Sequence, residues 1–139
     1  LPAAKAAGVG IIARVPLASG LLSGKYTSET RFAEDDHRNY NRTGAAFDVG
    51  ETFSGVDFEL GLQAVAEFQQ LVPQGVGTAQ AAIAWVSAQD GVTAVIPGAR
   101  TVEQARANAA GGAAITPEFD ESVRSIYDRY FREAVHPRW

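Results

Sequence analysis

The stretch "AVIPGARTVEQARANAAG", residues 94–111, passes within a few positions from an apolar run to a turn and then to a helical pattern. The run 92–96, "VTAVI", is rich in β-branched residues and is typical of a buried strand, which Pro97 ends. Thr101 is a favourable residue to cap the helix that follows. This part of the chain therefore predicts a strand, a tight turn and a short helix.

The turn in this unit has the residue types of a phosphate-binding site. Gly98 permits unusual backbone angles and close approach of an anion, Arg100 offers a planar set of donors, and the helix N-terminus presents free N–H groups. A second interpretation is structural, because Thr101 and Gln104 form a capping box by themselves. Glu103 in the first turn would also repel an anion. The pattern alone leaves both interpretations open.

A similar unit lies near the start of the chain. Residues 9–14, "VGIIAR", predict a second strand, buried on both faces of a parallel sheet and ended by Pro16. The loop 15–26 then holds residues whose N–H, hydroxyl and ammonium groups suit a pyrophosphate, namely Ser19, Gly20, Ser23, Gly24 and Lys25. The alternative is a hydrophobic loop in which the glycines allow close packing.

The segments between and after these strands fall into a long loop and several helices. Residues 27–55 are polar, charged and rich in glycine, which predicts a lid, a binding loop or disorder. Apolar periodicity predicts helices over 57–72, over 78–89 with Thr78 as cap, and over 116–131. The order is therefore strand, loop, helix, helix, strand, helix, helix.

Two parallel strands cannot form a sheet with both faces covered and both edges protected. We therefore expect the remaining strands to come from further sequence or from a partner chain. Residues 2–8 are typical of the last turn of a helix closed by Gly8, and the chain contains no methionine. These features favour a piece of a longer protein.

The composition excludes several classes of function. The 139 residues carry a net charge of only −4, without the basic surface of a nucleic-acid binder or a long apolar membrane segment. The absence of cysteine excludes disulfides and thiolate chemistry, so a cytoplasmic protein is expected. The stretch "EDDHRNYNR", residues 34–42, contains Asp36, His37, Arg38 and Tyr40, which could suggest acid–base catalysis, but consecutive loop residues rarely converge on one reacting atom. His37 and His136 are far apart and give no metal-ligand spacing.

Together, three stretches resemble the aldo-keto reductase family. These are "IIARVPLASGLLSGKY" (residues 11–26), "AAIAWV" (residues 81–86) and "VIPGARTVEQARANAA" (residues 95–110). They are similar to strand 7 and its loop, the helix before strand 8, and strand 8 itself, in the branch with Ile-Pro-Gly. That branch includes many bacterial reductases and the potassium-channel β subunit.

The resemblance implies an α/β fold, with residues 1–139 as the C-terminal portion of a (β/α)₈ TIM barrel that binds NADP(H). The loops after strands 7 and 8 commonly form a phosphate site in such barrels. Segment 27–55 would fold over the cofactor as a clamp. The implied cofactor residues are Gly98, Ala99 and Arg100 at the 2′-phosphate, Gln104 and Asn108 at the adenine, Leu17, Ser19, Gly20, Leu22 and Lys25 at the pyrophosphate, and Arg14 at the nicotinamide.

The chain departs from the family pattern at three of these positions. Val15 replaces a serine and Ala99 replaces serine or threonine, so two hydroxyl donors are lost. Arg14 stands where many members place an aromatic ring, although a guanidinium plane can also stack. The family's catalytic Asp, Tyr, Lys and His come from earlier strands, and this chain has no residue at those positions.

These observations predict the cofactor-binding part of a reductase that converts a small carbonyl compound to an alcohol, and that is inactive as an isolated chain. A non-catalytic nucleotide-binding or partner-binding half-barrel is the alternative. A fragment without a function of its own is a third possibility. The sequence does not name the carbonyl substrate.

Overall fold

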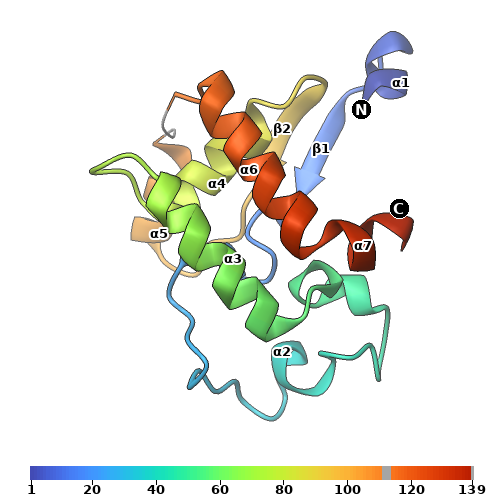
Figure 1. The fold of residues 1–139 in the computed structure, drawn as a ribbon, viewed down its shortest axis with the longest axis vertical. Helices are drawn as coiled ribbons and strands as arrows, with labels where there is room; N and C mark the ends of the chain where they lie inside the picture. Colours follow the sequence, from blue (N-terminus) through green and yellow to red (C-terminus); the bar gives the residue numbers. More distant parts are fainter. Residues whose placement is uncertain (111–113, 139) are drawn as a thin grey trace.

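A computed structural model describes residues 1–110 and 114–138; Gly111, which ends the stretch quoted first, lies outside them. Within this part of the chain, β1 (Ile11–Arg14) and β2 (Val92–Ile96) pair in parallel. Arg14 lies opposite Ile96, so both strands end at the same level (Figure 1). The predicted α/β class is confirmed.

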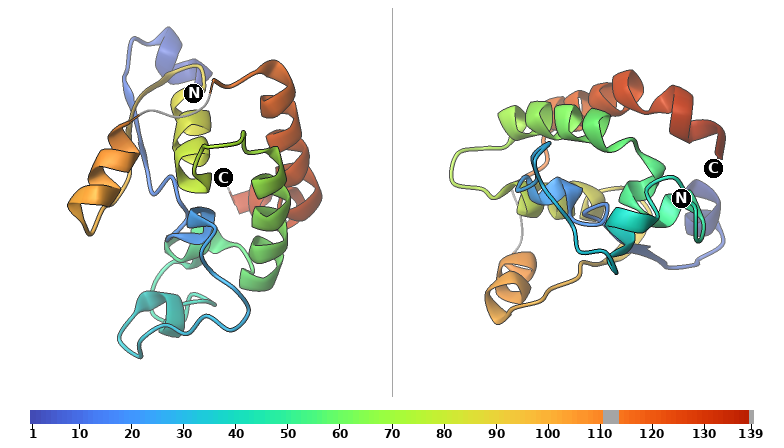
Figure 2. Two further views of the ribbon diagram at one scale, coloured as in Figure 1. Left: turned by 90° about the vertical axis from the view of Figure 1, so that its left-hand side faces the viewer. Right: turned by 90° about the horizontal axis from the view of Figure 1, so that it is seen from below.

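The longer helices lie on one side of this pair of strands. Figure 2 shows α4 between the strands and an outer pair of helices, α3 and α6. The α-helices are α1 (Pro2–Ala6), α2 (His37–Tyr40), α3 (Phe58–Leu71), α4 (Thr78–Ser87), α5 (Val102–Ala109), α6 (Pro117–Tyr130) and α7 (Arg132–Val135). Short 3₁₀ turns are η1 (Leu21–Ser23), η2 (Val49–Glu51), η3 (Phe53–Gly55) and η4 (His136–Arg138). None of the described helices is both long and apolar enough to cross a membrane.

Side chains cap the N-termini of the two longest helices, α3 and α6. The Asp57 carboxylate accepts a hydrogen bond from the Leu60 N–H at 3.0 Å, and the Thr116 hydroxyl accepts one from the Phe119 N–H at 3.2 Å. The prediction of Thr78 as a cap was wrong, because Gly77 occupies that position and donates its N–H to the Gln80 side chain. The main core forms where these helices meet and contains Ala64, Phe68, Ala81, Ala82 and Ile126.

The helix predicted to end near Gly8 is also present. In α1 the Val9 N–H reaches back to the Ala4 carbonyl at 2.9 Å, and the Gly8 N–H reaches the Lys5 carbonyl. Gly8 has a positive φ of 66°, which its lack of a side chain permits. The chain therefore enters β1 directly from the end of a helix.

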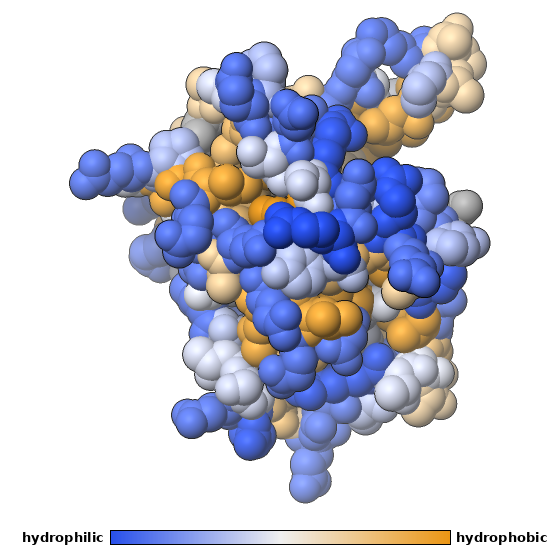
Figure 3. All heavy atoms as spheres, viewed as in Figure 1, coloured by the Kyte–Doolittle hydropathy of each residue, from blue (hydrophilic) through white to orange (hydrophobic). Residues whose placement is uncertain are grey.

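The predictions that β1 is buried on both faces and that β2 is a buried strand were wrong in this structure. Ile12 and Ile96 are 64% and 57% exposed, and Arg14 and Ala94 beside them are also exposed. These four residues are paired across the ladder, so they form one face that no described element covers. Figure 3 looks onto the opposite side of the molecule, where α3 and α6 lie in front of the strands and hydrophobic residues show between hydrophilic ones. A two-stranded sheet cannot cover both its faces, which is the physical reason.

Segment 27–55 is packed more closely than its polar sequence predicted. It contains α2, η2 and η3, and Phe53, only 1% exposed, packs with Phe58 in a second core cluster. Buried Asn41 accepts the N–H groups of Ala46 and Phe47, and it donates to the buried Thr52 hydroxyl. Isolated aromatic residues and local hydrogen bonds order this segment, and neither produces a periodic pattern.

Candidate nucleotide-binding site

The two loops predicted to bind the cofactor leave the same end of the sheet. Loop 15–20 follows β1 and loop 97–101 follows β2, and parallel pairing places both at the carboxyl end of the strands (Figure 1). Ligands of α/β proteins commonly bind at this end. The fold therefore gives the two motifs a common location.

In the second loop, the predicted adenine-binding amides hold the turn itself. The Arg100 N–H donates to the Gln104 side-chain oxygen at 2.7 Å, and the Asn108 amide donates to the Gly98 carbonyl at 3.2 Å. The Thr101 hydroxyl caps α5 by accepting the Gln104 N–H at 3.2 Å. The predicted cap at Thr101 is confirmed. The second half of the capping box differs, because the Gln104 side chain accepts the N–H of Arg100 and not that of Thr101. These bonds give the turn a defined shape.

The residues of this loop differ in how well they could contact a bound anion. Arg100 is exposed, as are Gly98 and Ala99. The expected special backbone conformation of Gly98 is absent, because its φ is not positive and an added Cβ would meet nothing within 4 Å. The Glu103 carboxylate is held by its own N–H and the Thr101 hydroxyl, which lower its pKa. A carboxylate therefore already occupies the first turn of α5, whereas the side chain of Arg100 is exposed.

The first loop is tight and partly strained. Val15, Ala18 and Ser19 all have positive φ values, of 52°, 46° and 55°. Gly20 also has a positive φ, and a Cβ there would lie 2.5 Å from the Tyr26 hydroxyl. The Ser19 hydroxyl accepts the Phe53 N–H at 3.1 Å, so it joins this loop to segment 27–55. Strained, over-determined backbone of this kind is common at ligand sites.

Among the other predicted residues of segment 15–26, some pack against the core and one is exposed at the surface. Leu17 and Leu22 pack against the main core, so a ligand would meet their backbone more than their side chains. Lys25 is exposed, and no hydrogen bond within the described residues involves its ammonium group. Lys25 is therefore available to an anion.

Arg14 lies at the end of β1 and makes a contact that the sequence did not predict. Its two terminal nitrogens donate to the two carboxylate oxygens of Glu51 at 3.0 and 2.9 Å. The hydrogen bonds from Arg14 lower the pKa of Glu51. The signal in the sequence is weak, because 37 positions separate the partners and no local pattern links them.

Arg38, from the same stretch as His37 and Tyr40, makes contacts that the sequence did not predict. It pairs with Asp36, donates to the Tyr26 hydroxyl at 2.6 Å, and lies 4.7 Å from the centre of the Phe32 ring. The Asp36 carboxylate also caps α2 through the Arg38 N–H. This cluster connects the end of the first loop to segment 27–55.

The potential acid–base residues of this segment serve as structural contacts. His37 Nδ1 lies 3.1 Å from the buried Thr52 hydroxyl, and the exposed Tyr40 packs its ring edge-on against Phe47. No group of three or more His, Asp or Glu residues suited to a metal occurs in the described part of the chain. Within the described residues, neither of these two side chains forms a hydrogen bond with Arg14 or Glu51.

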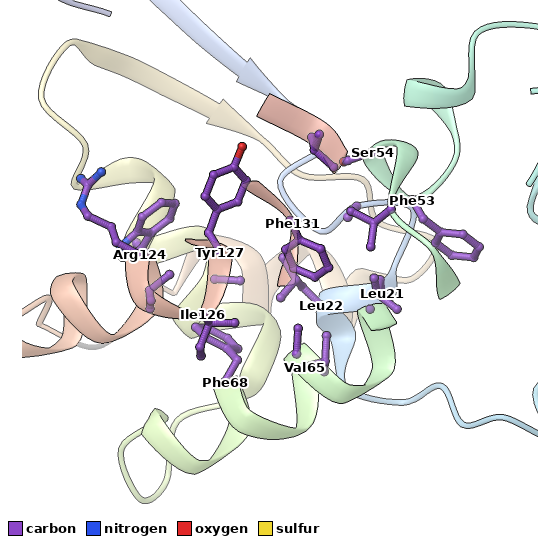
Figure 4. Close-up of a pocket in the computed structure, with 18 of the residues that line it drawn as sticks. Leu21, Leu22, Phe53, Ser54, Val65, Phe68, Arg124, Ile126, Tyr127 and Phe131 are labelled. Carbon is purple, nitrogen blue, oxygen red and sulfur yellow. The ribbon is translucent and has the colours of Figure 1, made fainter. Parts of the chain in front are cut away.

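A separate apolar cavity of about 570 Å³ lies on the helix side of the sheet (Figure 4). Its walls include Leu21, Val65, Ile126, Tyr127 and Phe131. Leu22 is the one predicted cofactor residue that lines it. Arg14 and Arg100 do not line this cavity.

Comparison with known proteins agrees with this arrangement. The model of the "Aldo/keto reductase family" matches residues 1–128. The chain belongs to the aldo/keto reductase family. It is 35% identical to a probable voltage-gated potassium channel subunit beta of Arabidopsis thaliana, over 73% of this chain and 29% of the relative. It is 34% identical to L-glyceraldehyde 3-phosphate reductase of Escherichia coli, over 73% of this chain and 28% of the relative.

A solved structure supports the fold of this family member. Glycerol dehydrogenase AKR11B4 of Gluconobacter oxydans superimposes with a TM-score of 0.73 at 29% identity, covering 94% of this chain and 38% of that chain. The chain spans about a third of the length of the curated relatives it matches. The expected correspondence to a portion of an aldo-keto reductase barrel is confirmed.

The contacts of Arg38 predict how segment 27–55 responds to acid. The hydrogen bond from Arg38 lowers the pKa of Asp36 from 3.8 to about 2. The charged pair therefore stabilises the segment fully above about pH 4, and this contribution is lost as the pH falls toward 2. Hydrogen exchange of the α2 amides, corrected for intrinsic rates, measures the opening free energy over this range.

We expect Asp36→Asn to lower the opening free energy of the α2 amides at pH 5. The same substitution should make this free energy fall less between pH 4 and pH 2. Asp35→Asn is the matched control, because Asp35 is an exposed neighbouring carboxylate. An acid response that is the same in Asp36→Asn as in the unmodified protein would contradict the assignment.

Proposed function

We propose that this chain provides the NADP(H)-binding C-terminal portion of an aldo-keto reductase that reduces a small carbonyl compound to an alcohol. The observation that carries the proposal is the common position of the two loops at the carboxyl end of β1 and β2. Membership of the family supports the reaction class. The remaining strands would come from the rest of the barrel or from a partner chain.

The residues at this end of the sheet fit a dinucleotide phosphate. Arg100 is exposed on a turn whose backbone is held by Gln104 and Asn108, so its position is defined before a ligand arrives. Lys25 and the tight backbone at Gly20 supply a cation and close approach for a pyrophosphate. We propose that the amides act by holding the turn, and contact the adenine only along the exposed side of α5.

A bound nicotinamide would supply the hydride, and this chain would bind and orient it. Arg14, on the open face of β1, is the residue we assign to the ring. Carbonyl reduction also needs a proton donor within hydrogen-bond distance of the developing alkoxide. His37 and Tyr40 contact Thr52 and Phe47 instead, so we assign the donor and the substrate pocket to the rest of the barrel.

A non-catalytic role is the second candidate. One relative bears the name of a potassium channel subunit beta, and within the described residues neither His37 nor Tyr40 forms a hydrogen bond with Arg14. Such a protein would retain nucleotide binding without turnover. The test is activity of the intact protein, because both candidates require the same cofactor site.

Cofactor preference is the first test of the proposal. We expect the intact protein to bind NADPH more tightly than NADH, and Arg100→Ala to weaken NADPH binding by about tenfold to a hundredfold. One charge-assisted contact with the 2′-phosphate contributes about 1.5–3 kcal/mol. Fluorescence titration of both cofactors measures this difference.

Two further variants sharpen that titration. Arg106→Ala removes an exposed cation from the last turn of the same helix and should leave the preference unchanged. Glu103→Gln removes the carboxylate at the helix N-terminus and should strengthen NADPH binding. Equal affinity of the unmodified protein for NADPH and NADH would contradict the phosphate assignment.

The isolated 139-residue chain should reduce no carbonyl compound, because the proton donor is assigned to the rest of the barrel. NADPH oxidation with a panel of aldehydes measures this activity. A flat trace, with turnover restored when the rest of the barrel is present, is the expected result. Sustained turnover that is abolished by His37→Ala or Tyr40→Phe would show that the donor lies in this chain.

A further inference from the structure

We propose that Glu51 is a positioning residue that holds the Arg14 guanidinium as a flat, charge-compensated platform for the nicotinamide ring. The inference rests on the proposed NADP(H) function and adds a residue to the same site. It also explains how a charged arginine can stack on the nicotinamide at a position where many family members have an uncharged aromatic ring.

Both partners of this ion pair stand on well-anchored backbone. Arg14 is the last residue of β1, paired in register with Ile96. Glu51 ends η2, whose first turn is capped by Asp48, which accepts the Gly50 N–H at 2.8 Å. Phe53, two residues later, is buried in the second core cluster. The carboxylate is thus presented by packed structure, although most of segment 27–55 is exposed.

The geometry of the pair fixes the plane of the guanidinium. Two hydrogen bonds, of 3.0 and 2.9 Å, join the two terminal nitrogens of Arg14 to the two oxygens of Glu51. A bidentate pair of this kind restricts rotation of both groups and holds them roughly coplanar. The side chains of Arg14 and Glu51 are 64% and 47% exposed, so the pair leaves surface for a ligand.

This pairing distinguishes between two uses of an arginine. A guanidinium that binds phosphate or carboxylate needs its terminal donors and its charge free. In Arg14 both terminal nitrogens already contact a carboxylate, so a further anion would compete with Glu51. The flat face of the group is not used by this contact, and such faces stack on aromatic rings. The contact therefore favours a stacking role for Arg14.

The charge of the pair matters because the two forms of the cofactor differ at the nicotinamide ring. The oxidised ring carries a positive charge and the reduced ring does not. An unpaired guanidinium against the ring would repel the oxidised form, whereas the Glu51 carboxylate offsets this repulsion. Glu51 should therefore set the relative affinity for NADP⁺ and NADPH, which an anchor of the loop alone would not do.

The test is the ratio of the dissociation constants of NADP⁺ and NADPH for the intact protein. Glu51→Gln should raise this ratio about fivefold, the effect of one like-charge contact at about 4 Å in a water-like dielectric. In an Arg14→Tyr background the same substitution should leave the ratio unchanged, because no cation remains to be compensated. Glu34→Gln, an exposed carboxylate of the same segment, is the control for overall charge.

The outcomes separate this inference from the function on which it rests. Equal weakening of both forms, or no change, would overturn the positioning role while leaving cofactor binding intact. A ratio that changes equally with and without Arg14 would also overturn it. If the unmodified protein binds neither form, the proposed function fails and the inference fails with it.

Discussion

Parallel hydrogen bonding joins β1 to β2 from Ile11, opposite Val92, to Arg14, opposite Ile96, and this pairing sets the position of both predicted cofactor loops. The strands are separated by a crossover that contains segment 27–55, α3 and α4. Because the pairing is parallel, the turn with Arg100 and the strained loop with Ser19 emerge at one end. An antiparallel pairing would place them at opposite ends and remove the shared surface.

Segment 27–55 is attached to this end by side chains of different kinds. Phe53 enters an aromatic cluster, the Ser19 hydroxyl accepts the Phe53 N–H, and Glu51 pairs with Arg14. Each contact joins the segment to the end of β1 or to the loop that follows it. A ligand on the open face of the sheet would therefore meet a segment already anchored beside it, with exposed stretches on either side.

The sequence predicted those features that depend on local pattern. The start of a helix near Asp57, the cap at Thr116, the helix end at Gly8 and the two strands all follow from residues within a few positions of one another. The family could be predicted because three motifs occur in the right order and spacing. The cofactor residues taken from that resemblance stay predictions, although the structure places their two loops together.

Features that depend on distant contacts could not be predicted. The order of segment 27–55 comes from single aromatic residues and from the buried Asn41–Thr52 contact, which produce no periodic signal. The Arg14–Glu51 pair joins positions far apart in sequence. The exposure of Ile12 was missed because a β-branched run indicates a strand suited to burial without showing which faces are covered.

The central claim is that the loops after β1 and β2 together bind the cofactor. A crystal structure of the intact protein with NADP⁺ tests it most directly. In that structure we expect the 2′-phosphate within hydrogen-bond distance of the Arg100 guanidinium and the nicotinamide ring against the plane of Arg14. A nucleotide bound in the apolar cavity beside Tyr127 and Phe131, with Arg14 and Arg100 both free of it, would contradict the account.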